Sequence, residues 1–534
     1  MSTDATTLEL RSRGSRAALV EERFEALRRA SRRPAVQANV ALGTIVVCCL
    51  LIVLAAAGRP TFLSATTRPL YFPSWMSGPL GGLTPGLAQL ASLKELFAGA
   101  ILLTYLCYVV ALRRAEHLRV RTVVGCILAL HAILLLAPPL ALTDVFNYLD
   151  YARREVIHHL NPYTTIPRLE PHTDPAFALS NWHGLLSPYG PLFTIMTFLL
   201  APLSLGAFFW SFKAILLVTD LAILLLVWKS AVLLQRQPLL ARASSAPQSG
   251  RRTFPTRVDP LTALVLVGLN PIVLVWGLGG DHNDFFTIFF VVLGFYLLLR
   301  ARAASLPGAP ALSGLMRARR LRLPPGAALD AGAGAALVLA AGLKASAGIV
   351  IPIVLASLLR SPRRLAAVLV GAGLATLVTA AATISAFGVH FPDLTLQTSL
   401  VTDLSIPNLL GLALGQGGET GVLHGVLTVA LAGAIVAACV WAYRTAEPLA
   451  AAGWAMLAAL VATSWVLPWY VIWVLPLAAL AGSRRLRIAA LVLGAYLIVA
   501  WSPATGEVLN ALHLHPGKTA VGRAHAREVH SLLF

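Results

Sequence analysis

Long apolar runs recur along almost the whole chain, and they limit more than any other feature how it can fold. The runs are roughly 14 to 23 residues long, close to the length at which an α-helix crosses a bilayer. Of the 534 residues, 57% are hydrophobic and only 12% are charged, which excludes an ordinary soluble globular domain. The sequence therefore predicts an all-α polytopic membrane protein. The five cysteines fall inside these runs without metal-ligand spacing, so we expect them to be buried small side chains.

The formal net charge of +19 is concentrated in particular places. About 30 of the 42 Lys and Arg residues lie in the N-terminal tail and in the segments between apolar runs. This distribution is typical of cytosolic segments that face anionic membrane lipid, and it argues against nucleic acid as a partner. The basic segments are the tail, 113–121, 235–258, 300–322, 360–364, Arg444 and 484–487.

These segments predict the direction of each apolar run, which gives about 13 crossings with the N-terminus in the cytosol and the C-terminus outside. In the region 188–234 we expect a short Pro-bounded element, 188–202, followed by one long tilted helix. Two short helices, 327–343 and 346–359, are expected to meet at Lys344, and a single helix is expected at 259–278. The predicted regions are a basic cytosolic tail (1–37), helices 1–3 (38–141), a large external loop (142–187), membrane helices (188–387), a second external loop with a short amphipathic pattern (388–421), C-terminal membrane helices (422–505) and an external tail (506–534).

The stretch 143–193 combines carboxylates, Arg, His, Tyr and Trp, so it cannot lie in hydrocarbon. Asp144, Tyr148, Tyr151 and Glu155 are spaced to share one face of a helix. We expect Thr143 to cap that helix, which places Asp144 in its first turn, a residue or two beyond the third membrane helix. Asp144 is then either the general base for a sugar hydroxyl or a helix-capping residue at the water interface.

Three cations are candidates for binding a phosphate. Arg153 and Arg154 lie further along the same predicted helix, where guanidinium groups either bind phosphate or contact lipid headgroups. Lys344 lies between two apolar helices among small residues, which suggests coordination of an anionic headgroup; the alternative is a side chain that extends to the membrane surface.

The turn Gly280-Asp281-His282-Asn283-Asp284 can bind a sugar, hold a metal weakly or form a solvated hairpin, and sugar binding is favoured. Six aromatic residues either line the membrane interface or stack on sugar rings. They are Trp182, Tyr189, Trp465, Trp469, Tyr470 and Trp473. For the histidines of the C-terminal tail, a disordered segment is the favoured interpretation.

The order of several short motifs resembles that of the GT-C glycosyltransferases, and more narrowly the actinobacterial polyprenol-phosphate-mannose-dependent mannosyltransferases. The similarity covers roughly residues 120–480. The chain departs from the family pattern at His158-His159-Leu160, where a Gly usually precedes Asn-Pro-Tyr, and at Asp281, which is often small. The matching elements are Asp144, Tyr148, the following Arg, Asn161-Pro162-Tyr163, Ser187-Pro188-Tyr189-Gly190-Pro191, Asn270-Pro271, the Gly-Gly-x-His-Asn-Asp turn, Lys344 and Pro468-Trp469-Tyr470.

The resemblance implies an inverting mannosyltransferase of the plasma membrane whose active site is on the external face. Its donor would be polyprenyl-phosphate mannose and its acceptor a glycan or glycolipid, with no cofactor expected. Asp144 would act as the base, and Lys344, Arg153 or Arg154 would bind the donor phosphate. The residues implied in sugar or acceptor binding are Tyr148, Tyr151, Asn161, Tyr163, Tyr189, Asp281, His282, Asn283, Asp284, Trp469 and Tyr470. A secondary transporter or a lipid-carrier flippase is the alternative, because broken helices and a membrane-embedded Lys occur there too.

Overall fold

The computed structural model describes residues 33–58, 73–83, 86, 90, 92–140, 144–244, 258–305 and 326–533. Every regular element in these ranges is a helix, which confirms the all-α prediction. Most of the predicted cytosolic tail, Thr143 and most of the basic segments 235–258 and 300–322 lie outside the described residues.

Six helices are long and apolar enough to cross a membrane, and the number rises to seven if the bent pair α18 and α19 forms one span. The protein is therefore a multi-pass membrane protein by the length and composition of its helices, while the number of about 13 crossings stays a prediction. The long helices are α2 (Pro34–Ala57), α3 (Leu93–Arg113), α7 (Leu205–Ser244), α9 (Asp284–Ala304), α12 (Pro362–Phe387) and α15 (Gly421–Thr445).

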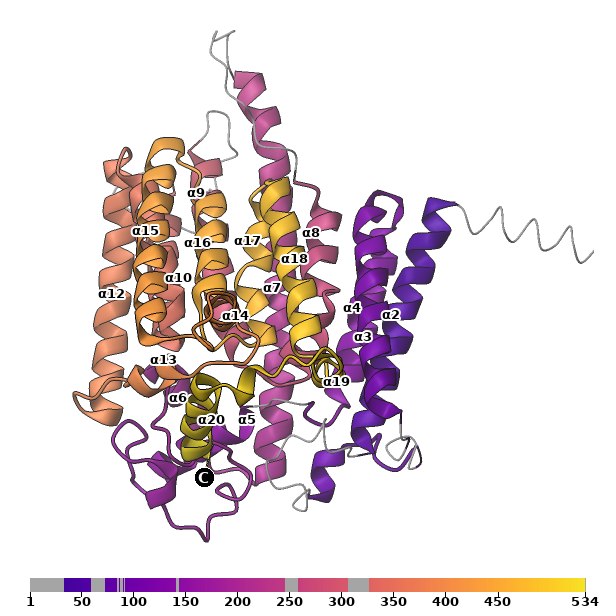
Figure 1. The fold of residues 1–534 in the computed structure, drawn as a ribbon. Helices are drawn as coiled ribbons and strands as arrows, with labels where there is room; N and C mark the ends of the chain where they lie inside the picture. Colours follow the sequence, from indigo (N-terminus) through magenta and orange to yellow (C-terminus); the bar gives the residue numbers. More distant parts are fainter. Residues whose placement is uncertain are drawn as a thin grey trace, which may run out of the picture.

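Shorter apolar helices fill the space between the long ones. They are α4 (Val120–Leu135), α8 (Pro260–Gly268), α10 (Ala327–Leu343), α11 (Val350–Leu358), α16 (Pro448–Ala462), α17 (Leu475–Leu480) and α18 (Arg484–Ala500). Figure 1 shows α2, α3 and α4 standing together on one side of the bundle, with α7 and α8 between them and the remaining helices.

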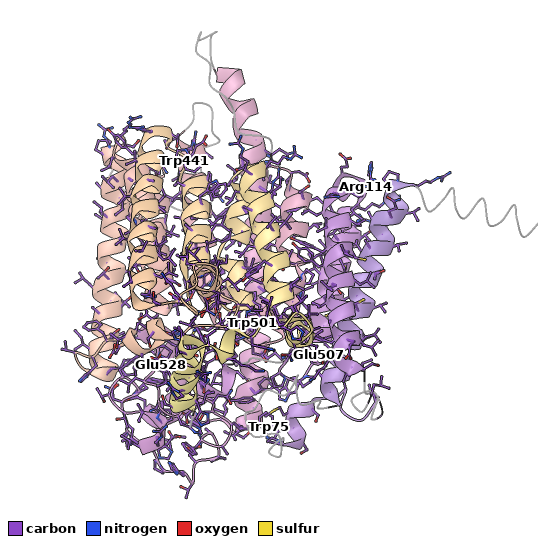
Figure 2. All side chains as sticks on the ribbon, in the orientation of Figure 1. Trp75, Arg114, Trp441, Trp501, Glu507 and Glu528 are labelled. Atoms are coloured by element: carbon purple, nitrogen blue, oxygen red, sulfur yellow. The ribbon has the colours of Figure 1, made fainter. Side chains whose placement is uncertain are left out.

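The two ends of the bundle differ in what they carry. One end carries the short helices α5 (Val145–Val156), α6 (Pro191–Phe198), α13 (Thr395–Ser399), α19 (Thr505–Ala511) and α20 (Ala520–Leu533); we call it the site end (Figure 1). Arg114 and Trp441 lie at the opposite end (Figure 2). The structure thus separates the first large polar loop from the basic residues between α3 and α4, as the positions of the charges predict.

Helix breaks occur where the sequence analysis predicted continuous helices. The single helix expected at 259–278 is wrong: α8 ends at Gly268, and a π-helical turn, η6 (Val273–Leu278), follows after Asn270-Pro271. Proline lacks an amide hydrogen and disfavours a helical conformation in the preceding residue, and the Asn270 side chain accepts from the Ile272 amide at 3.0 Å. The remaining short helical turns are η2 (Ser74–Ser77), η4 (Ala115–His117), η5 (Pro167–Leu169), η7 (Ala345–Ile349), α14 (Ile406–Ala413), η8 (Pro468–Trp473) and η9 (Pro516–Lys518).

Two further boundaries differ from the prediction. Helix α4 ends at Leu135, so Asp144 follows a connecting segment and does not lie directly beyond a membrane helix. The C-terminal tail is also not a disordered segment, because α19, η9 and α20 account for most of residues 505–533. Helix α20 places Leu532 in a small apolar cluster with Leu185 and Leu400, and this burial favours a folded tail.

Candidate active site

Helix α5 begins at Val145 and leaves Asp144 as its N-cap residue, so the prediction that Asp144 lies in the first turn is wrong by one position. The Asp144 carbonyl accepts hydrogen bonds from the amides of Asn147 (2.9 Å) and Tyr148 (3.1 Å). Its carboxylate makes no capping hydrogen bond and is 23% exposed. The helix therefore fixes the backbone of Asp144 and leaves its side-chain oxygens available to a ligand.

The turn at residues 279–284 lies directly beside Asp144. His282 Nδ1 is 3.5 Å from Asp144 Oδ2, and the Asn283 amide donates to the Tyr148 hydroxyl at 3.2 Å. Gly279 permits this close packing: a Cβ there would lie 2.4 Å from a methyl carbon of Leu140. A chain segment 138 residues further along is thus held against the start of α5.

His282 is held by an aromatic stack. The side chain is fully buried, and its ring lies parallel to the Trp469 indole, with ring centroids 3.4 Å apart and an interplanar angle of 12°. Neither ring nitrogen has a hydrogen-bond partner among the described residues. The stack therefore sets the plane of the imidazole, and Nδ1 lies next to the Asp144 carboxylate.

Lys344 forms a second charged group beside the same turn. It ends α10, and its Nζ donates to Asp284 Oδ1 at 2.7 Å, while the Trp473 indole donates to the same oxygen at 2.5 Å. Nζ also lies 4.7 Å from the centroid of the Tyr470 ring. Because an ammonium has three donors and Lys344 is 17% exposed, it retains capacity for an external anion.

The turn is anchored by an ion pair that the sequence analysis missed. Lys213 of α7 donates to both oxygens of Asp281 at 3.0 and 3.2 Å, and both side chains are fully buried. Asp281 has a φ of 58°, a conformation unusual for a residue with a side chain. The pair accounts for an Asp at this position, because Lys213 would otherwise be a buried unpaired charge.

Three tyrosines of the predicted sugar-binding set form an aromatic cluster beneath Asp144. The rings of Tyr148 and Tyr189 contact edge to face at 4.8 Å, and that of Tyr151 lies 5.9 Å from Tyr189. All three are buried, and burial raises the pKa of the Tyr148 hydroxyl well above its usual value. They support the start of α5, and only Tyr148 has its hydroxyl directed to the 279–284 turn.

Asn161 and Tyr163 have internal partners. The Asn161 side chain donates to the Phe387 carbonyl at 2.8 Å, and the Tyr163 hydroxyl lies 2.8 Å from that of Thr194. The Gly190 amide donates to the Leu343 carbonyl at 3.1 Å, and a Cβ on Gly190 would lie 2.1 Å from the Gly342 carbonyl. These two motifs thus connect the first loop to α12 and to the end of α10, directly before Lys344.

Arg153 and Arg154 are already paired with carboxylates. Arg153 Nε donates to Asp174 at 3.1 Å, and the fully buried Arg154 lies 3.7 Å from Asp150 and 3.5 Å from Glu170. Burial raises the pKa of Glu170 to about 10, and the neighbouring Asp150 adds to the shift. Both arginines therefore lie among carboxylates of the first loop, and their binding of a donor phosphate stays a prediction.

Several buried polar atoms near the 279–284 turn lack a hydrogen-bond partner among the described residues. Buried polar groups are normally paired, so an unpaired cluster of donors and acceptors indicates a place where a polar ligand binds. The atoms are Asn147 Nδ2, both ring nitrogens of His282, Asn283 Nδ2, Asp284 Oδ2 and Thr287 Oγ1. Among the residues that the structure describes, no group of three or more His, Cys, Asp or Glu side chains is arranged to hold a metal ion.

Sequence reasoning missed Lys213 and Asn147, which both lie next to aromatic residues in the sequence. Lys213 lies in Trp-Ser-Phe-Lys-Ala-Ile, where a membrane helix ending at the surface explains a lysine equally well. Asn147 lies in the predicted helix, but it is not one of the four residues whose spacing defines the polar face of that helix. The sequence does indicate Trp473, which closely follows Pro468-Trp469-Tyr470 and is one of the six aromatic residues expected at the membrane interface or on a sugar ring.

Comparison with protein families places this site in context. The N-terminal domain of the alpha-(1->6)-mannopyranosyltransferase family, described as MptA_B, matches residues 38–247 and 250–360. The MptB C-terminal domain matches residues 402–521. No curated protein and no solved structure matches the chain. Because the first match alone spans more than half of the sequence and includes Asp144, the 279–284 turn and Lys344, the chain belongs to the alpha-(1->6)-mannopyranosyltransferase family and is a mannosyltransferase.

Proposed function

We propose that this mannosyltransferase takes mannose from polyprenyl-phosphate mannose and transfers it to a hydroxyl group of a glycan or glycolipid. The reaction would take place at the site end, on the external face of the plasma membrane, as in a GT-C glycosyltransferase. The observation that carries the proposal is that two partly exposed side chains of opposite charge both lie against the 279–284 turn. Asp144 is 23% exposed and lies beside His282, and Lys344 is 17% exposed and contacts Asp284. One suits removal of a proton, and the other suits a leaving phosphate.

The proposed chemistry is a single displacement. The acceptor oxygen attacks the anomeric carbon of mannose while its proton passes to the Asp144 carboxylate. The bond between the anomeric carbon and the phosphate oxygen breaks, and the electron pair leaves with the polyprenyl phosphate. One displacement inverts the anomeric configuration, so one catalytic carboxylate suffices. If the product is alpha-linked, as the family name states for the family, the donor must carry beta-linked mannose.

Each charged group has a distinct part in this step. The imidazole of His282, 3.5 Å from Asp144, keeps the carboxylate directed toward the acceptor. Lys344 binds the phosphate, whose charge grows as the bond to the sugar breaks, so its contribution is largest in the transition state. Asp284, which pairs with Lys344, holds the ammonium beside the turn and gives up part of its interaction when phosphate is present.

The lipid chain of the donor needs a route to Lys344 from the bilayer. Directly after Lys344, the turn η7 exposes Ala345, and a Cβ on Gly348 would meet no atom within 4 Å. Helices α12 and α15, which follow η7 and α11 in the chain, leave most of their apolar residues at least partly unburied. A polyprenyl chain lying against this surface would keep its phosphate near Lys344.

The test is direct transfer. Purified protein would be incubated with radiolabelled polyprenyl-phosphate mannose and a set of mannose-containing acceptors, and with GDP-mannose as the matched soluble donor. The proposal requires label in the acceptor from the lipid-linked donor only. Transfer from GDP-mannose alone, or no transfer to any acceptor, would contradict it.

One observation favours the alternative of a transporter. His131 of the apolar helix α4 lies 3.1 Å from Asp220 of the membrane-spanning candidate α7, and both side chains are buried. Intramembrane pairs of this kind occur in proton-coupled transporters. Substrate movement into protein-containing vesicles that is lost in Asp220→Asn but retained in Asp144→Ala would support transport.

A further inference from the structure

Trp182 and Trp465 form an aromatic pair beside the proposed active site. Trp182 comes from the first large loop and Trp465 from the segment between α16 and η8, and their rings meet in a T-shaped contact at 5.8 Å. Both indoles are only partly buried, whereas the neighbouring Trp469 is 3% exposed and Trp473 is 7% exposed. In a T-shaped pair, the ring that contributes its edge keeps its faces available for other contacts.

Trp182 is connected to the region of Asp144 through Asn147, and Trp465 is close in sequence to Trp469, which stacks on His282. The Asn147 side-chain oxygen accepts from the backbone amides of Asn181 at 2.8 Å and Trp182 at 3.3 Å. Asn147 lies three residues after Asp144, so the two share one face of α5. Trp465 lies four residues before Trp469, and the Trp469 indole stacks on His282.

A free hydrogen-bond donor lies between Asp144 and the pair. Asn147 is 2% exposed, and its Nδ2 has no partner among the described residues, although its oxygen is fully used. A buried amide donor without an acceptor costs stability, so such a group indicates a ligand with an acceptor oxygen. Sugar hydroxyls supply such oxygens, and the C–H face of a pyranose ring packs well on an indole.

Helix α20 holds the pair from the outside. Leu532 contacts Leu185 and Leu400, and both tryptophans pack against this cluster. The Gly184 amide donates to the Leu532 carbonyl at 2.8 Å, and a Cβ on Gly184 would lie 2.9 Å from the Ser531 carbonyl. Figure 2 shows Glu528 of α20 at the site end. The match to the MptB C-terminal domain stops at residue 521, so nearly all of α20 lies beyond it.

We propose that Trp182 and Trp465 bind the sugar next to the one that accepts mannose, with Asn147 Nδ2 donating to a hydroxyl of the acceptor and α20 keeping the two indoles in place. This inference rests on the proposed function and makes it more specific. The acceptor is then a glycan of at least two sugars, and a single-sugar acceptor leaves the aromatic pair unused.

The experiment compares acceptors of one and two mannose units that carry the same aglycone, using purified full-length protein and polyprenyl-phosphate mannose. We expect the wild type to prefer the two-sugar acceptor in kcat/KM by about tenfold, and Trp465→Ala and Trp182→Ala to reduce that preference to about one. Trp465→Phe should retain most of it. Trp441→Ala, which removes a 37% exposed indole from α15 at the opposite end, is the matched control and should keep the wild-type preference.

Three results would overturn the inference: no preference in the wild type, a preference retained in both alanine variants, or equal losses for the two acceptors. The last would mean that the tryptophans only support the fold. Direct binding of the two-sugar acceptor, measured by calorimetry in detergent, separates this inference from the proposed function. Binding that is weakened in Trp465→Ala supports the aromatic site even if the donor assay fails.

Discussion

The two ends of helix α5 carry charged residues that are treated in opposite ways. At its start, the Asp144 carboxylate is partly exposed, and several polar atoms around it have no partner among the described residues. At its end, Arg153 and Arg154 are paired with Asp174, Asp150 and Glu170. The difference lies in exposure and ion pairing: the partly exposed carboxylate at the start is available to a substrate, and the ion-paired arginines at the end hold the loop that follows.

The largest expected effect comes from a substitution at the start of α5. Asp144→Ala should reduce kcat for mannose transfer by about 10² to 10⁴-fold, because the acceptor hydroxyl loses its base. The melting temperature should stay near the wild-type value, since among the described residues the carboxylate caps no amide and has one long contact, with His282. Initial rates and thermal unfolding in detergent measure both. Undiminished turnover in a folded Asp144→Ala protein would exclude the base role.

Arg154→Met removes a buried cation from the other end of α5. Removing this cation leaves Asp150 buried without its ion-pair partner, which should destabilise the protein by about 3–5 kcal/mol. The measurement is denaturant-induced or thermal unfolding, with Arg363→Met as an exposed control that should change stability by about 0.5 kcal/mol or less. If Arg154→Met were stable and lost only affinity for the donor, the assignment of the two ends would have to be exchanged.

Lys344→Met removes the cation that we propose binds the donor phosphate. Loss of a charge-assisted hydrogen bond to phosphate should raise the KM for polyprenyl-phosphate mannose by roughly 10- to 100-fold. Lys94→Met removes an exposed lysine from the start of α3 and should leave this KM within about twofold. A donor KM unchanged in Lys344→Met would show that the phosphate binds elsewhere.

The last expected effect, seen only as the pH is raised, is on stability. Because burial raises the pKa of Glu170 from 4.5 to about 10, the folded protein favours the neutral form of this carboxyl. Its contribution to stability is fully present below about pH 4.5 and is lost as the pH rises through about 10. Glu170→Gln stays neutral, so its melting temperature should fall less than that of the wild type between about pH 7 and about pH 10. An equal fall in melting temperature in both proteins between these pH values would contradict the raised pKa of Glu170.

The sequence predicted the helical class and the chemical identity of the main site residues, because hydropathy and isolated charges are local properties. Asp144, His282 and Lys344 were recognisable as polar residues in an apolar chain. Their mutual arrangement was not predictable. The pairing of Lys213 with Asp281 joins positions 68 residues apart, and the sequence does not show that Arg154 lies beside Glu170.

The breaks in the helices and the fold of the tail had different causes. Asn270-Pro271 was visible in the sequence, but the apolar run across it outweighed the helix-breaking signal. The histidines of the tail favour a disordered segment, whereas its fold depends on Leu532, whose partners Leu185 and Leu400 are more than 100 residues away. Contacts of this kind require the tertiary structure.

The central claim is that one carboxylate, Asp144, activates an acceptor for a single displacement from a lipid-linked mannose. It is tested most directly by the anomeric configuration of the product, determined by NMR after transfer by the wild-type protein from polyprenyl phosphate that carries beta-linked mannose. The account predicts an alpha-linked product. A beta-linked product would contradict it, because retention requires a second displacement and a nucleophile that forms a covalent intermediate.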